Sequence, residues 1–245
     1  QKFHIFVLPP VFCKHYPRLP LKSQTTDKAS CHFPPRVLYW KIRLISRKEF
    51  HFMPPISVLL KPSSSLCNMS CDYCFYCDEA SKREVSSYGF MEETTLKNII
   101  RRTLLRAEGS AAYAYQGGEP TLRGLDFFRK AMEYQKQYNK NHVAVSNALQ
   151  TNGYALNEEW CQFLKENHFL VGLSLDGTEE IHNAHRHDKA GNGTYARIKH
   201  AADLMDQYQV DYNILTVVTA DIAERIEEIY AEYRKNGWHY QQYIP

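Results

Sequence analysis

The amino-acid sequence predicts an α/β fold in which parallel strands alternate with helices. From residue 53 onward, short apolar runs alternate with longer runs of helical period. Glycine or polar residues follow most of the apolar runs, as is typical of strand ends. Strands separated by helices favour a parallel sheet. The pattern alone leaves open whether six such units close partway into a barrel or form an open doubly wound sheet.

The predicted strands are short and rich in β-branched, aliphatic and aromatic residues, which suit a buried parallel sheet. The first of them is the run ISVLL, and the last stands at the end of the chain. We expect strands at residues 56–60, 111–116, 148–151, 169–175, 212–218 and 240–244.

The predicted helices have one apolar face each. In the first, Leu96, Ile99 and Leu104 recur at helical spacing. Asn157 has the side chain of a helix N-cap, and Asn236–Gly237 is a typical helix stop. We expect helices at residues 94–108, 125–138, 157–166, 194–208 and 222–235.

Composition divides the 245 residues into two unequal parts. Residues 1–52 carry ten Lys and Arg against two Asp and Glu, whereas the remainder has a net charge of −5. We interpret residues 1–52 as an extraneous or poorly ordered extension, with a genuine N-terminal arm as the alternative, and residues 53–245 as one domain. The acidic main part argues against a nucleic-acid partner. No apolar run reaches the roughly 18 residues of a membrane span.

Four of the seven cysteines lie within eleven residues, directly after the first predicted strand. Cys67, Cys71 and Cys74 form a C-x3-C-x2-C run, and Cys77 follows. Thiols this close indicate metal binding rather than a disulfide framework. Three thiolates would hold an iron–sulfur cluster and leave one iron open. A zinc site that includes Cys77 is the alternative, although structural zinc sites usually pair two C-x2-C units farther apart.

Polar and glycine motifs follow the next three strands. They are Gly117-Gly118-Glu119, residues 151–153 and residues 174–177. The carboxyl ends of parallel strands are where such folds build their sites, so we expect these motifs to meet the cysteine run. Taken singly, each motif is equally typical of an ordinary turn.

The cysteine run, with an aromatic residue before its last cysteine, resembles the radical S-adenosylmethionine (SAM) superfamily. The longer pattern is similar to one branch, the anaerobic sulfatase-maturating enzymes, which generate formylglycine. The resemblance is collinear over residues 53–245 and implies a partial (β/α)6 TIM-like barrel. It is carried by residues 61–62, 67–76, 116–121, 150–153, 172–177 and 181–183 and by Arg186.

The resemblance implies two cofactors, a [4Fe–4S] cluster and SAM, and a role for each matching residue. Cys67, Cys71 and Cys74 would bind the cluster, with Cys77 as a bystander. Gln116 would face the substrate peptide. SAM would be bound by Tyr73, Gly117, Gly118, Glu119, Ser174 and Arg186. The glycines would let the ligand approach the backbone, Glu119 would accept from its ammonium, and the Arg186 fork suits its carboxylate.

The implied reaction oxidises a Cys or Ser of a sulfatase polypeptide to formylglycine through a 5′-deoxyadenosyl radical. The expected partners are that sulfatase and an electron donor such as flavodoxin or ferredoxin, with no nucleic acid or membrane, in the cytoplasm. No catalytic residue is identified, because the family's general base and auxiliary-cluster domain are expected beyond Pro245, so we expect a fragment. The alternatives are another peptide-modifying radical SAM enzyme, forming thioethers or maturing a quinone cofactor, and a non-catalytic zinc-binding interaction module.

Overall fold

The computed structural model describes residues 55–245, so the predicted extension at residues 1–52 lies outside the described residues. The described part contains a six-stranded sheet in which every neighbouring pair is parallel. The strands are β1 (Ile56–Leu60), β3 (Ser110–Tyr115), β4 (Ala144–Thr151), β5 (Phe169–Ser174), β7 (Asp211–Val217) and β8 (Gln241–Ile244).

Strand order answers the question that the pattern left open. The order across the sheet is β1-β3-β4-β5-β7-β8, which is also their order along the chain. A doubly wound sheet reverses direction at a switch point, whereas a barrel adds each strand on the same side of the last. The predicted α/β class with a partial (β/α)6 barrel is therefore confirmed.

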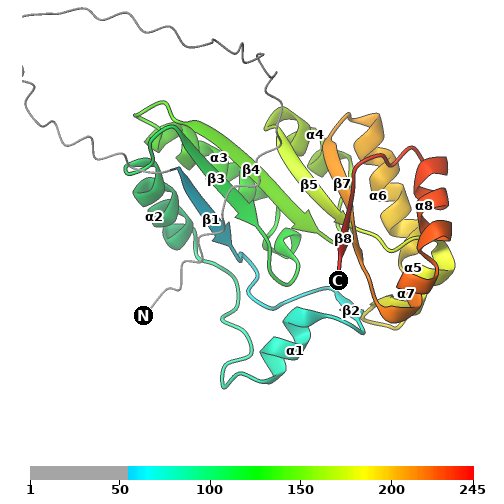
Figure 1. The fold of residues 1–245 in the computed structure, drawn as a ribbon. Coiled ribbons are helices and arrows are strands. Elements are labelled where there is room, and N and C mark those ends of the chain that lie inside the picture. The colour runs from blue at the N-terminus through cyan, green and yellow to red at the C-terminus, as the bar shows by residue number, and fades with distance from the viewer. Residues whose placement is uncertain (1–54) are drawn as a thin grey trace, which may run out of the picture. The chain divides into compact units, whose positions relative to one another are not determined.

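Helices cover one face of this sheet (Figure 1). The predicted helix at residues 222–235 is wrong in one respect, because Arg225 leaves helical geometry (φ −107°, ψ 19°) and divides it in two. No helix within residues 55–245 is long and apolar enough to cross a bilayer. The helices are α2 (Glu93–Leu104), α3 (Leu125–Tyr138), α4 (Glu158–Glu166), α6 (Tyr195–Gln207), α7 (Ala220–Glu224) and α8 (Ile226–Lys235).

The core lies between the sheet and these helices. Alternate residues of β3 are buried, including Tyr113 and Tyr115. Tyr115 packs on Phe128 of α3 with ring centroids 5.1 Å apart, and Phe128 packs edge-on against Trp160 of α4 at 5.2 Å. Aromatic pairs of this kind add about 0.5–1.5 kcal/mol beyond the burial of their area. The helix-facing side chains therefore hold the sheet rigid beneath its carboxyl edge.

Several short elements around the cysteine run have no counterpart in the predicted pattern. The segments β2 and β6 pair as an antiparallel ribbon in which Cys71 lies opposite Arg186. Pieces of three to seven residues are too short to show a period in sequence, and only their partners define them. They are β2 (Met69–Cys71), α1 (Phe75–Ser81), the 3-10 helix Pro120–Arg123, α5 (Glu179–His185) and β6 (Arg186–Asp188).

Candidate functional site

The cysteine loop runs from the end of β1 into α1, at the carboxyl edge of the sheet (Figure 1). Cys67, Cys71 and Cys74 are free and half-buried. Cys71 ends β2, and Cys74 is the N-cap residue of α1. Burial raises the pKa of Cys71 to about 11, because an apolar environment disfavours a thiolate. Such thiols become thiolates only when a cation compensates them.

The glycine pair after β3 holds the start of this loop in place. The Gly118 N–H donates to the Ser64 carbonyl at 2.9 Å, and the Glu119 N–H donates to the Leu66 carbonyl at 2.7 Å. A Cβ on Gly118 would lie 2.0 Å from the Leu66 oxygen, and Gly117 has a φ of +121°. The structure thus provides a different reason for these glycines from the one expected: the backbone that approaches them closely is the protein's own.

Glu119 is buried, and its carboxylate is already engaged by the protein. One oxygen accepts from the Thr121 N–H at 3.0 Å, the Thr121 hydroxyl at 2.7 Å and the Thr151 hydroxyl at 2.8 Å. The other accepts from the Asn152 N–H at 2.8 Å. Burial raises the pKa of Glu119, and these four donors oppose the shift. Glu119 therefore braces the loop after β4, and only its second oxygen retains capacity for a further donor.

Asn152 connects that brace to the cysteines. Its amide nitrogen lies 3.6 Å from Cys67 Sγ and donates to the Asn68 side-chain oxygen at 2.9 Å. In the sequence Asn152 belongs to a strand-end motif, which by itself indicated no role for this residue. Its position directly after a strand, in the row of motifs at one sheet edge, is the signal that could have identified it.

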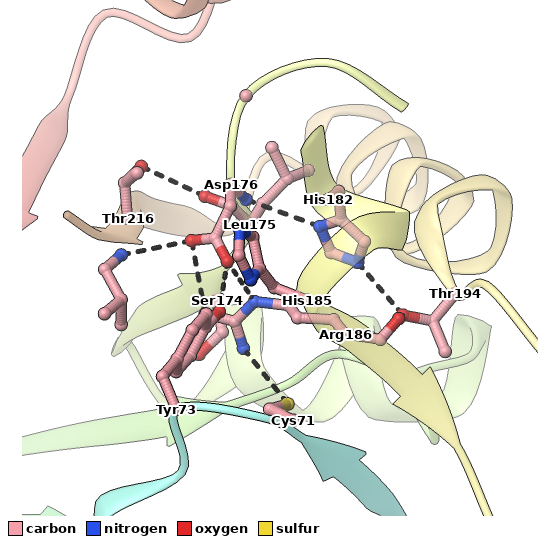
Figure 2. A network of polar contacts seen from close by, with 12 residues as sticks. Cys71, Tyr73, Ser174, Leu175, Asp176, His182, His185, Arg186, Thr194 and Thr216 are labelled. Carbon is pink, nitrogen blue, oxygen red and sulfur yellow. Dashed lines mark hydrogen bonds and ion pairs between the residues drawn. The ribbon is translucent and has the colours of Figure 1, made fainter. Parts of the chain in front are cut away.

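Asp176 lies at the centre of a second polar network (Figure 2), and the sequence pattern indicated no role for this residue either. Its carboxylate accepts from Arg186 Nε at 2.7 Å and Nη2 at 3.3 Å, from the Val217 N–H at 3.1 Å, and from the Tyr73 hydroxyl. The Asp176 side chain is fully buried and that of Arg186 is 7% exposed. The guanidinium also lies over the Tyr73 ring, 5.4 Å from its centroid.

Charge complementarity keeps this network ionised. Burial alone would raise the pKa of Asp176, but Arg186 and the Tyr73 hydroxyl hold it below its usual value. His182, behind Asp176, is held neutral because burial and Arg186 lower its pKa to about 3. A buried pair with this geometry is costly to break from one side, since the remaining charge loses its partner.

The loop is also fastened from outside by His185. Its Nδ1 lies 2.9 Å from an Asp72 oxygen and its Nε2 lies 2.7 Å from an Asp221 oxygen. Asp72 stands between two of the cysteines, and Asp221 belongs to α7. His185 therefore joins the cysteine loop to the segment that follows β7.

The face of the sheet opposite the helices carries a row of carboxamides. In the strand register Gln150 lies beside Gly172, which lies beside Asn213, and Gln116 follows β3 at the same level. Gln150 donates to the Ser174 hydroxyl at 3.1 Å. A hollow of about 240 Å³ is lined by Gln116, Gln150, Asn213 and Gln242 among others. Two predicted residues, Gln116 and Ser174, are thus linked by one row of polar groups.

The donor set fits an iron–sulfur cluster better than a single zinc ion. Cys77, the fourth ligand of the zinc alternative, is exposed on α1. A cubane takes its thiolates at separate irons, so it needs sulfur donors spread over one loop, as the three half-buried cysteines are.

A parallel α/β sheet in sequential order, with a three-cysteine loop after its first strand, defines a cofactor-dependent class of enzyme fold. Residues 62–233 match the family model described as "Radical SAM superfamily". The chain belongs to the radical SAM superfamily, whose cofactors are a [4Fe–4S] cluster and SAM. The resemblance stated from the motifs is confirmed at this level.

The similar relatives include enzymes of the expected branch. The chain is 45% identical over 192 residues to a cysteine-type anaerobic sulfatase-maturating enzyme of Clostridium perfringens, covering 78% of this chain and 52% of that enzyme. It is 37% identical to a serine-type anaerobic sulfatase-maturating enzyme of Klebsiella aerogenes, covering 78% and 47%. The chain thus spans about half the length of the curated relatives that it matches.

Solved structures agree with these relatives. Native anSMEcpe with bound AdoMet superposes with a TM-score of 0.75 at 45% identity, covering 78% of this chain and 52% of that one. The same protein with AdoMet and the Kp18Cys peptide superposes with a TM-score of 0.74 at 44% identity, covering 78% and 51%. That protein binds AdoMet and a peptide together.

Proposed function

We propose that residues 53–245 form the radical SAM core of an anaerobic sulfatase-maturating enzyme, which oxidises a Cys or Ser of a sulfatase polypeptide to formylglycine. The observation that carries the proposal is the loop of three free cysteines, held at the carboxyl edge of the sheet by the glycine pair. The similarity to sulfatase-maturating enzymes supports the choice of branch.

Cys67, Cys71 and Cys74 would hold the cluster. They are half-buried, unpaired and supplied with nearby N–H groups, from Met69 at 3.4 Å and Asn152 at 3.6 Å to Cys67 Sγ. Donors of this kind compensate the negative charge of thiolate ligands. Bound there, the cluster and SAM supply radical chemistry that removes a hydrogen atom from the substrate β-carbon.

The proposed SAM site lies between the glycine motif and the Asp176 network. Gly117 and Gly118 offer backbone carbonyls, and the Glu119 oxygen that accepts from the Asn152 N–H retains capacity for one further donor, the ammonium. Ser174 and Tyr73 border the same edge. A guanidinium has five N–H donors, of which two point at Asp176. Arg186 therefore keeps donors for the SAM carboxylate.

The carboxamide row is the proposed place of the substrate polypeptide. Carboxamides both donate and accept, so they pair with the N–H and C=O groups of an extended backbone. Gln116, at the carboxyl end of β3, would be the carboxamide side chain of this row that lies nearest the cysteine loop. The hollow of about 240 Å³ limits the site to a short segment of chain.

The remaining partners follow from the same chemistry. The site needs one-electron reduction, which we assign to flavodoxin or ferredoxin. All five cysteines within the described residues are free, which suits a reducing compartment, and we propose the cytoplasm.

The test is anaerobic reconstitution of the full chain with iron and sulfide, followed by SAM, dithionite and a sulfatase peptide. We expect about four irons and four labile sulfides per chain, with release of 5′-deoxyadenosine and a formylglycine-sized mass change in the peptide. Cleavage of SAM without that mass change, or with a thioether in its place, would assign the chain to another peptide-modifying branch. One zinc and no sulfide would overturn the proposal.

Two cysteine variants provide a matched comparison. Cys71→Ser removes a proposed cluster ligand, and Cys77→Ser changes an exposed thiol three residues beyond the last of them. We expect Cys71→Ser to lose iron and SAM cleavage, and Cys77→Ser to retain both. Equal loss in the two variants would mean that all four thiols are ligands.

A further inference from the structure

Arg186 touches one of the proposed cluster ligands as well as Asp176. Its Nη1 lies 4.0 Å from Cys71 Sγ, as the dashed line in Figure 2 shows. The antiparallel ribbon fixes this distance, since Cys71 and Arg186 are opposite one another in the β2–β6 register. A SAM-binding role alone does not account for a cation held beside a ligand sulfur.

The orientation of the guanidinium is set by Asp176. That carboxylate takes Nε and Nη2 from one edge of the planar fork, which leaves Nη1 pointing at the sulfur. The Val217 N–H and the Tyr73 hydroxyl hold the carboxylate itself. The contact is therefore built from buried, mutually braced groups rather than from a free side chain.

The charge is placed where it has a large effect. Arg186 is nearly fully buried, so water screens it little. Nη1 is the guanidinium nitrogen that faces Cys71 Sγ, whereas Nε and Nη2 face Asp176, so the positive charge reaches the sulfur at the edge that the carboxylate leaves open.

We propose that Arg186, positioned by Asp176, raises the reduction potential of the cluster held by Cys71. This inference rests on the proposed function. When an external one-electron donor reduces the cluster, the added negative charge spreads over the cluster and its thiolates. A fixed cation with an N–H directed at one of those sulfurs stabilises the reduced form, and hydrogen bonds to sulfur are a recognised determinant of cluster potential.

The experiment is an anaerobic redox titration of the reconstituted full chain without SAM, followed by the electron paramagnetic resonance of the reduced cluster. Leaving SAM out removes any contribution from a carboxylate contact. The first variant is Arg186→Gln, which removes the cation but leaves the buried Asp176 carboxylate without its partner. The second is the double variant Asp176→Asn with Arg186→Gln, which replaces the ion pair by two neutral amides and serves if the single variant does not fold. Arg129→Gln, which breaks only two exposed ion pairs, one within α3 and one between α3 and α4, is the control.

We expect the reduction equilibrium of both Arg186 variants to become about tenfold less favourable, a fall of about 59 mV for a one-electron couple. Arg129→Gln should titrate like the parent. Equal potentials in the parent and the Arg186 variants would overturn the inference and leave the proposed function intact. A parent chain that assembles no cluster would overturn both.

Discussion

Single residues at the sheet edge act mainly by holding one another. Glu119 accepts four protein hydrogen bonds, and Asp176 accepts four as well. Neither carboxylate is free in the way that a solvated ligand-binding group would be. Each connects two loops that belong to different strands, so both carboxylates help to position the cysteine loop.

Gly118 shows how little space that positioning leaves. We expect Gly118→Ala to destabilise the fold by about 1–3 kcal/mol, the usual cost of overpacking, because the new Cβ meets the Leu66 carbonyl. It should also reduce iron uptake, since Leu66 directly precedes Cys67. Denaturant unfolding and iron analysis check both effects.

Gly191→Ala is the control for that change. A Cβ there meets nothing within 4 Å, and only its φ of +86° is unfavourable. We expect a cost of about 1–2 kcal/mol with iron uptake intact. Iron uptake unaffected by Gly118→Ala would contradict the view that this contact positions the loop.

Among the elements, helix ends follow local rules that variants can test. The Asn157 side chain caps α4 by accepting from the Trp160 N–H at 3.0 Å. We expect Asn157→Ala to lower the free energy of unfolding by about 1 kcal/mol, measured by urea denaturation. Glu92 occupies the same position at α2 without a side-chain cap, so Glu92→Ala should cost nothing measurable. Equal losses of unfolding free energy in Asn157→Ala and Glu92→Ala would show that side-chain capping is not the cause of the loss.

The fastening of the cysteine loop by His185 predicts a pH dependence. Burial would lower the pKa of His185, but Asp72 and Asp221 raise it above its usual value. Arg186 is its charged chain neighbour, and Tyr73 packs on its ring at 5.6 Å. A raised pKa means that the stabilisation is present below about pH 6.5 and is lost as pH rises through the raised value.

We therefore expect the melting temperature of His185→Gln to fall farther below that of the parent at pH 6 than at pH 9. Thermal unfolding of the chain without iron at the two pH values measures the difference. His142→Gln, which replaces a histidine away from the cysteine loop, is the control variant. A deficit that is the same at both pH values would show that His185 contributes packing and not charge.

For the whole molecule, cofactor binding and stability are linked. If SAM binds the folded chain carrying a cluster, a hundredfold excess over its dissociation constant should add about 2.7 kcal/mol to the free energy of unfolding. Anaerobic thermal unfolding with and without SAM measures the gain. The iron-free chain and Cys71→Ser should gain much less, because the proposed site is then incomplete. Equal stabilisation of all three would place SAM binding outside the cysteine loop.

Much of the architecture was predictable from periodicity. The strand at residues 56–60 and the helix at residues 125–138 agree with β1 and α3 residue for residue. The strand at residues 148–151 was too short, since β4 begins at Ala144. Polar residues at the start of β4, including Ser146 and Asn147, hide that extension. Neighbouring strands, which sequence does not show, supply its hydrogen bonds.

Local patterns in the sequence were sufficient to predict the α/β class and the three-cysteine loop, because buried strands, amphipathic helices and closely spaced thiols are all encoded within a few neighbouring residues. They also identified the edge of the sheet where the motifs meet, since parallel strands share their carboxyl ends. The three-dimensional structure was needed to show that Gly118 faces protein backbone, that Asn152 reaches Cys67 and that Asp176 orients Arg186 toward Cys71. These contacts join residues far apart in the chain, and distance in space between such residues depends on strand register and packing.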